Sequence, residues 1–224
     1  MQNRYVGDIG DFGKYGLLQV LCDGSPSLKL GVVWYLYNPS DEHTDDGKHT
    51  AYLDWEKPKP TKQNLDRFAS CDGDLYQKLR KLVKNKDRNV SAIARSGVLP
   101  SGTVLYDKPL TFDNVPPSAK TEREQLRNRW LEDAVRKMQG RDLVFLDPDN
   151  GLEVRSTSPC SKRGPKYVFL EEIEPYIARK QSVVIYQHVS RQGTAEEQVR
   201  SKVKQLREEL CVHNTMALYY GRGT

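Results

Sequence analysis

The stretch from Asp142 to Gly151, DLVFLDPDNG, joins an apolar run to a polar turn. Its first part, Asp142 to Leu146, is too short for a helix and is rich in residues that favour β-structure. It therefore predicts a core strand that is covered on both faces, as in a parallel sheet. Because open α/β sheets bind ligands just beyond the carboxyl ends of their strands, Asp147 to Asn150 lie where a ligand is expected.

Short apolar runs alternate with longer helical patterns along most of the chain, which is typical of βαβ units. We predict an α/β, Rossmann-like fold with a mainly parallel, doubly wound sheet, in one domain over 1–224 with a helical insertion at about 54–117. Strands are expected at 28–37, 103–107, 142–146, 182–187 and 215–220, and helices at 11–22, 75–83, 90–94, 116–138, 167–179 and 194–210. Two of the helices have expected N-terminal signals: Ser118, and Thr194 with Glu197 as its capping-box partner.

Composition restricts the class of protein. No apolar segment approaches the ~20 residues that span a bilayer, and the first residues lack a charged region followed by an apolar one. We therefore expect a soluble, cytoplasmic protein without membrane association. The four cysteines form no C-x-x-C pair, which argues against a zinc ribbon and a dense disulfide framework. A net charge of +5 favours an anionic partner such as RNA or DNA.

Basic residues are concentrated between Lys78 and Arg95, where seven Lys or Arg accompany a single acid, Asp87. Such a segment is either a solvated helix face or a surface that contacts phosphates. The sequence leaves both interpretations open. Under the second, Lys81 and Lys84 are the expected substrate contacts.

A glycine-rich polar cluster, VGDIGDFGKY, lies near the start of the chain. Its glycines allow a close approach of the backbone to a ligand, and Lys14, on the first helical turn, can reach a phosphate or carboxylate. The alternative is that Asp8 and Asp11 only cap a surface helix. Both remain open at this stage.

Two further polar clusters follow predicted strands. Asp45, Asp46 and His49 come after the first strand, where they can bind a metal or a ribose or can simply be solvated. His188 and Arg191 follow the strand at 182–187, although a histidine in that position is also often a hydrogen-bonded core residue. Together with the opening turn, these clusters predict one polar site at the strand ends.

In sequence order, these motifs resemble those of the adenine-N6 methyltransferases that modify large-subunit ribosomal RNA. GDIGDFGKY is similar to their G-N-x-A-D-x-x-K-H element: Gly7, Asp11 and Lys14 match, while Asp8 and Tyr15 replace the Asn and the His. VFLDPDNG falls where that family has I-D-P-P-Y, and VVIYQHVSR resembles its strand ending in W-Y-P with an arginine beyond. The resemblance covers about half of the chain.

The resemblance implies a class I, Rossmann-like enzyme that binds S-adenosylmethionine and transfers a methyl group to an amino nitrogen of a nucleic acid. Catalysis in such an enzyme comes mainly from positioning the amine against the sulfonium. The implied site has the target amine at Asp147, Pro148, Asp149 and Asn150, with Lys14 closing it and His188 and Arg191 flanking it. The implied cofactor contacts are Asp8, Asp11, Asp45, Asp46 and His49.

Two departures from the family pattern keep other functions open. Asp149 and Asn150 stand where the family has its second proline and its stacking aromatic, and no G-x-G follows the first strand. The added carboxylates equally suit a nuclease or phosphodiesterase that uses Mg²⁺ or Mn²⁺. Its metal ligands would be Asp8, Asp11, Asp147 and Asp149. A third interpretation is a noncatalytic module that binds a nucleotide or nucleic acid.

Overall fold

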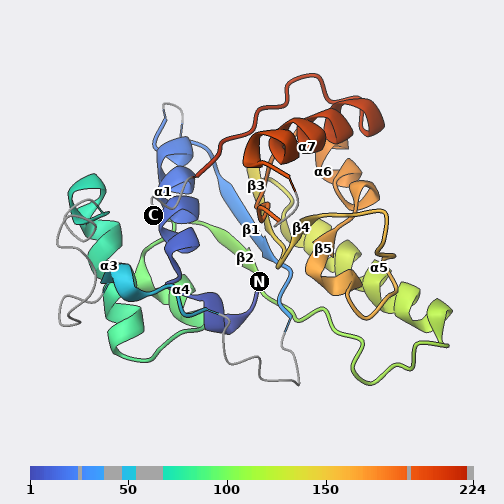
Figure 1. The fold of residues 1–224 in the computed structure, drawn as a ribbon, viewed down its shortest axis with the longest axis horizontal. Helices are drawn as coiled ribbons and strands as arrows, with labels where there is room; N and C mark the ends of the chain where they lie inside the picture. The colour runs from blue at the N-terminus through green and yellow to red at the C-terminus, as the bar shows by residue number, and fades with distance from the viewer. Residues whose placement is uncertain (25–26, 38–46, 54–67, 191–192, 221–224) are drawn as a thin grey trace. The chain divides into compact units, whose positions relative to one another are not determined.

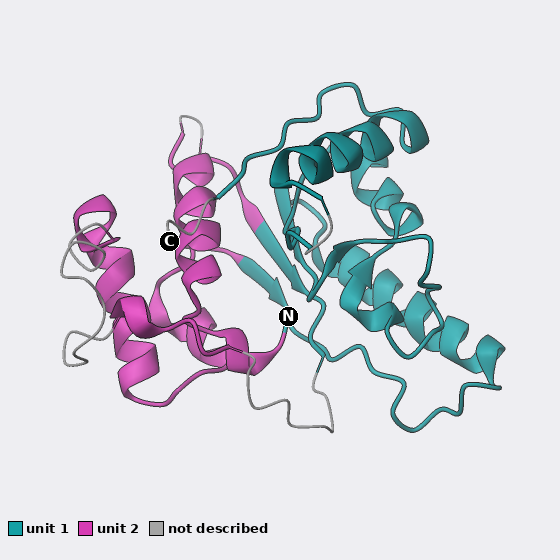
Figure 2. Cartoon of the chain, in the orientation of Figure 1, with its two compact units in different colours: residues 1, 31–37, 104–223 teal, residues 2–30, 38–103, 224 magenta. Residues whose placement is uncertain are grey.

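The structure is a computed structural model of the chain, and it describes residues 1–24, 27–37, 47–53, 68–190 and 193–220. The chain divides into two compact units (Figure 2). Unit 1 consists of residues 1, 31–37 and 104–223, and unit 2 of residues 2–30, 38–103 and 224. Among the described residues, no helix combines the length and the apolar character needed to cross a membrane.

Unit 1 is built on a parallel sheet of four strands in the order β2-β1-β3-β6 (Figure 1). The strands are β1 (Leu30–Trp34), β2 (Val104–Tyr106), β3 (Leu143–Asp147) and β6 (Ser182–Ile185). Every residue of β1 and β3 is buried, as expected for inner strands covered on both faces. The predicted α/β fold is confirmed, and the flanked parallel sheet is consistent with a Rossmann-like fold.

The strand order fixes where a ligand site is expected. After β1 the chain forms β2 on one side of it, and then returns to form β3 on the other side. The direction of winding therefore reverses between β1 and β3. In open α/β sheets this topological switch point is where ligands bind, beyond the carboxyl ends of the two strands.

Helices and a small second sheet complete unit 1. The helices are α5 (Lys120–Lys137), α6 (Glu174–Ala178) and α7 (Ala195–Glu209), with the 3-10 turns η3 (Gly164–Lys166) and η4 (Leu170–Glu172). The short strands β4 (Gly151–Leu152) and β5 (Tyr167–Val168) pair in parallel. The core is centred on Trp130 of α5. The centroid of its ring lies 4.7 Å from the ring centroid of Tyr35 and 5.3 Å from that of Tyr106.

Unit 2 is helical. Its described elements are η1 (Asn3–Tyr5), α1 (Ile9–Cys22), η2 (Ala51–Leu53), α3 (Gly73–Lys84) and α4 (Val90–Ser96). Helix α3 packs on both α1 and α4, and Leu18, Tyr76 and Leu79 are fully buried. Helices α3 and α4 fall within the predicted insertion at about 54–117, of which residues 54–67 lie outside the described residues.

Most predicted elements of the core form where the sequence pattern indicated, and the capping box of α7 is confirmed. The backbone N–H of Glu197 donates to Thr194 Oγ1 at 3.2 Å, and Glu197 Oε2 accepts from the backbone N–H of Thr194 at 2.8 Å. The predicted start of the preceding long helix was wrong. Helix α5 begins at Lys120 after Ala119, which makes no side-chain cap, so Ser118 is not the N-cap.

Two other predicted elements were wrong. The helix expected at 167–179 is instead β5, η4 and the short α6, because Glu172 accepts a hydrogen bond from the backbone N–H of Phe169 at 3.0 Å and holds a 3-10 turn. The strand expected at 215–220 does not form. The described residues provide no strand beside it, and a strand is stable only when its backbone groups are paired.

Candidate functional site

The DPDN turn, Asp147 to Asn150, begins with the last residue of β3, at the switch point of the sheet in unit 1. Both of its aspartates are buried. The carbonyl oxygens of Asp147 and of Tyr35, which follows β1, both accept hydrogen bonds from the α-amino group of Met1, at 3.2 and 2.9 Å. Asp149 Oδ1 lies 3.9 Å from the same nitrogen. The ends of β1 and β3 thus offer a set of oxygen acceptors that accommodates an ammonium group.

Gln187, just beyond β6, fixes the backbone of the DPDN turn. Its Nε2 donates to the carbonyl oxygen of Asn150 at 3.3 Å and to that of His188 at 2.9 Å. Its Oε1 accepts from the backbone N–H of Leu152 at 2.8 Å. One side chain therefore joins the end of β6 to the turn after β3. The sequence analysis missed this residue, although its position directly before His188 at a strand end was the available signal.

Lys166 also contacts the DPDN turn, through both its backbone and its side chain. Its carbonyl oxygen accepts from the backbone N–H of Asn150 at 2.9 Å, and its Nζ lies 3.1 Å from Asp149 Oδ2. The same Nζ lies 5.0 Å from the ring centroid of Tyr37, a cation–π distance. The sequence analysis missed Lys166 as well, because no local pattern shows that residue 166 lies beside residue 149. Asp149 is therefore neutralised by a lysine of its own unit.

Position 151, directly after the DPDN turn, requires glycine because of its backbone conformation. Its φ is +112°, and an added Cβ would lie 2.3 Å from Gln187 Oε1. We expect Gly151→Ala to destabilise the chain by roughly 2–4 kcal/mol, from backbone strain and overpacking together. Urea denaturation measures the loss. Gly73→Ala is the control, since an added Cβ there meets nothing within 4 Å and should not destabilise the chain. Equal effects at the two glycines would contradict the account.

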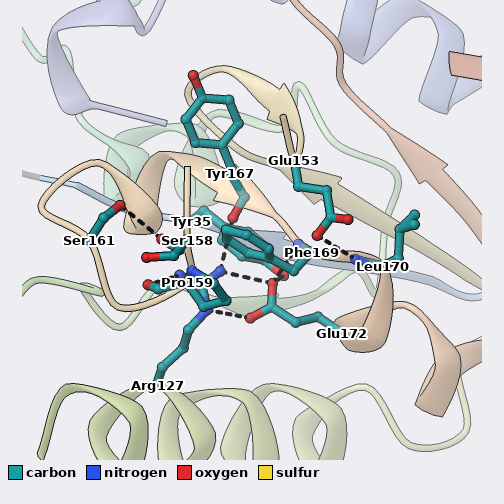
Figure 3. A network of polar contacts seen from close by, with 10 residues as sticks. All are labelled: Tyr35, Arg127, Glu153, Ser158, Pro159, Ser161, Tyr167, Phe169, Leu170 and Glu172. Atoms are coloured by element: carbon teal, nitrogen blue, oxygen red, sulfur yellow. Dashed lines mark hydrogen bonds and ion pairs between the residues drawn. The ribbon is translucent and has the colours of Figure 1, made fainter. Parts of the chain in front are cut away.

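A buried ion pair supports the end of β1 (Figure 3). Arg127 of α5 donates from Nε to Glu172 Oε1 at 2.6 Å and from Nη2 to Glu172 Oε2 at 2.9 Å. The hydroxyl of Tyr35 donates to Glu172 Oε2 at 3.2 Å. Burial raises the pKa of Tyr35 well above its usual value, and the Glu172 charge raises it further. Burial lowers the pKa of Arg127, but Glu172 outweighs this effect and the net shift is upward.

The same arginine also orders the loop that leads to Lys166. Arg127 donates to the carbonyl oxygens of Pro159 at 3.3 Å and Tyr167 at 2.9 Å (Figure 3). Arg123, one turn earlier, donates to the carbonyl of Cys160 at 3.0 Å. The network consequently fixes both the end of β1 and the segment that holds the DPDN turn. The sequence analysis did not identify it.

His188 and Arg191 were predicted to flank the site. His188 is half-buried, and its ring packs edge to face on Tyr186 with centroids 5.1 Å apart. It is connected to the DPDN turn through Gln187, which contacts both. Arg191 lies outside the described residues.

Asp8, Asp11 and Lys14 belong to unit 2 and have structural partners there. Asp8 is the N-cap of α1 and accepts from the backbone N–H of Gly10 at 3.2 Å, as the capping interpretation predicts. Asp11 accepts from the backbone N–H of Gly7 at 2.9 Å and pairs with Lys14 Nζ at 2.8 Å. All three side chains are buried. Their predicted roles at a ligand site stay predictions.

The remaining predicted cofactor contacts are His49, Asp45 and Asp46. His49 is exposed, and its carbonyl oxygen accepts from the backbone N–H of Ile9 at 3.0 Å. Asp45 and Asp46 lie outside the described residues. Within the described residues, no group of three or more His, Cys, Asp or Glu side chains is arranged to hold a metal ion. The alternative metal site therefore receives no support from the described part of the chain.

The basic segment of unit 2 separates into structural and exposed side chains. Arg88 donates to the carbonyl oxygens of Val6 and Gly47, both at 2.7 Å, and Lys78 donates to that of Gly97 at 2.9 Å. Lys81 and Lys84, by contrast, are exposed on α3. These two of the predicted substrate contacts are therefore accessible to a polyanion.

The chain was also compared with known proteins. It matches no protein-family model, and neither the curated proteins nor the solved structures contain a significant match.

Proposed function

We propose that this chain is a methyltransferase-like enzyme that transfers a methyl group from S-adenosylmethionine to an amino nitrogen of a nucleic acid. One observation carries the proposal. The polar DPDN turn begins at the last residue of β3, at the switch point of a parallel sheet, which is where such sheets bind nucleotide ligands. The resemblance of the motifs, in the same order along the chain, supports the same chemistry.

The groups at the switch point suit a cationic cofactor and an amine. The carbonyl oxygens of Tyr35 and Asp147 accept from the ammonium of Met1, which shows that oxygen acceptors at this point hold a cationic nitrogen. Asp107, directly after β2, offers an exposed carboxylate suited to the hydroxyls of a ribose. When bound, S-adenosylmethionine supplies an electrophilic methyl group on a sulfonium. The donor and acceptor types present are compatible with that group.

Under this proposal, the residues of the chain contribute to catalysis by positioning the target amine. The half-buried Asn150 side chain offers an amide oxygen to a target amine. Accepting an amine proton directs the nitrogen lone pair away from this oxygen and toward the methyl donor. Gln187 and Lys166 act indirectly, because they hold the backbone of Asn150. They are positioning residues under this proposal.

The test is methyl transfer itself. The full chain is incubated with methyl-labelled S-adenosylmethionine and either total RNA or genomic DNA, and the labelled nucleosides are identified after digestion. We expect label on an exocyclic amino nitrogen in one of the two pools. Strand cleavage that requires Mg²⁺ or Mn²⁺, without label, would instead support the phosphodiesterase. Binding of nucleic acid with neither reaction would support a noncatalytic module.

The exposed lysines of α3 give a second prediction. We expect Lys81→Glu with Lys84→Glu to weaken nucleic-acid binding by at least tenfold at low salt and to flatten its salt dependence, because fewer counterions are released. Fluorescence anisotropy over a salt series measures both. Lys120→Glu with Lys137→Glu, on exposed positions of α5, produces the same change in net charge and is the control. Equal losses in the two double variants would show that only net charge matters.

A further inference from the structure

We propose that two copies of this chain pair by exchanging the segment Thr215–Tyr220, which adds as a strand to the outer edge of β6 in the partner copy. The inference concerns unit 1 alone and does not rest on the proposed function. It follows from two features of that unit: a strand edge that no described residue pairs with, and an exposed segment with the composition of a strand.

The outer edge of β6 is open in the part of the chain that the structure describes. Among the described residues, β6 is the last strand of the sheet and pairs only with β3. The backbone N–H groups of Ser182 and Tyr186 donate to β3, so the alternating groups of Val183 and Ile185 face outward. No described residue hydrogen-bonds to these outward groups. An unpaired edge of this kind is a template for another strand.

The side chains of β6 also lack the cover that the inner strands have. All residues of β1 and β3 are buried, whereas Ser182 is exposed and the three apolar residues that follow are only partly buried. Strands of parallel sheets are normally buried on both faces. The β6 strand contains no charged residue or proline, which are the usual means of blocking edge pairing. Its composition is that of a strand with neighbours on both sides.

The segment Thr215–Tyr220, TMALYY, is the complementary feature. Its large apolar side chains are exposed to an extent that is rare in a soluble domain: Met216 81%, Leu218 64%, Tyr219 61% and Tyr220 43%. Exposed apolar side chains that together form a contiguous patch are typical of interaction sites. The segment is also rich in residues that favour β-structure, which is why the sequence predicts a strand there.

A second copy is the occupant that fits both features. The segment and the edge belong to the same unit and are joined by α7, yet within one chain residues 216–220 are exposed and the segment does not form a strand. Only Thr215, at its start, is partly buried, and its carbonyl oxygen accepts from Arg207 of α7 at 2.9 Å. A partner copy brings an identical edge and an identical segment, so a two-fold arrangement makes the exchange reciprocal and closes it after two copies. Each copy then satisfies the open edge of the other.

Size-exclusion chromatography with light scattering, and analytical ultracentrifugation for the dissociation constant, test the exchange. For the full chain at about 10 μM we expect a mass about twice 25.7 kDa. Met216→Lys with Leu218→Lys should raise the dimer dissociation constant at least tenfold. The control is Val20→Lys, at an equally exposed valine of α1, which should leave it unchanged. A monomeric chain, or a dimer that the double variant does not weaken, would overturn the proposal.

A variant of β6 tests the other half of the contact. Val183→Pro removes an outward N–H but no bond to β3, and proline is tolerated in that position of an edge strand. We expect it to weaken the dimer at least tenfold while the circular dichroism spectrum is retained. Hydrogen exchange gives a readout that needs no variant: the Val183 and Ile185 amides should be protected in the dimer and should exchange fast after dilution. Protection in a monomer would mean that the edge is covered within one chain and would overturn the exchange.

Discussion

Replacing Arg127 by methionine is expected to destabilise the chain by about 3–5 kcal/mol. The cost comes from Glu172, which stays buried and loses its partner. The side chains of Arg127 and Glu172 are only 4% and 2% exposed, so the variant leaves a carboxylate buried without its guanidinium. The loop carbonyls of Pro159 and Tyr167 lose a donor at the same time. Urea denaturation of the wild type and the variant measures the difference in free energy of unfolding.

Two controls make this prediction specific. Arg200→Met breaks an ion pair with Glu196 whose side chains are 77% and 74% exposed, and it should cost less than about 1 kcal/mol. Adding Glu172→Gln to Arg127→Met removes the buried charge and should recover part of the loss. If Arg127→Met costs no more than Arg200→Met, the network does not support the end of β1 as described.

Replacing Asn150 by alanine is expected to lower kcat/KM for methyl transfer by about 100-fold, the scale on which misplaced reacting groups reduce rates. The change removes an amide oxygen proposed to accept from the target amine. It keeps the backbone contacts to Lys166 and Gln187, which involve only main-chain atoms of Asn150. Methyl transfer and urea denaturation are measured on the same preparation.

Asn114→Ala is the matched control for this change, because it removes the same side chain from an exposed position elsewhere in unit 1. It should retain wild-type kcat/KM. For Asn150→Ala the free energy of unfolding should fall by no more than about 0.5 kcal/mol. The reason is that the Asn150 side chain is only half-buried. Full activity of Asn150→Ala would remove the amide from the mechanism.

The sheet could be predicted from the sequence because its strands are short apolar runs separated by helical patterns. DLVFLD predicts β3 since both faces of a central parallel strand are buried, and the chain therefore needs no polar alternation there. The capping box at Thr194 was predictable for a related reason: the signal is local and lies within four residues. Local patterns of this kind also indicated that a polar turn would follow β3.

Contacts between distant residues could not be predicted in this way. Arg127 and Glu172 are 45 positions apart, and no periodicity of one segment specifies a partner in the other. In place of the helix expected at 167–179, the segment that carries Glu172 forms β5, η4 and α6. The holding of the DPDN turn by Lys166 and Gln187 was missed for the same reason. The strand predicted at 215–220 failed because strand propensity does not supply a neighbouring strand.

We propose that the DPDN turn at the switch point between β1 and β3 is the ligand site of this protein. Amide chemical shifts of the isotope-labelled full chain, followed while S-adenosylmethionine is added, test it most directly. We predict saturable shifts, largest at Asp149, Asn150 and Gly151 and at Tyr35, with none from Mg²⁺ alone. Shifts confined to other residues, or no shift at millimolar cofactor, would contradict the claim.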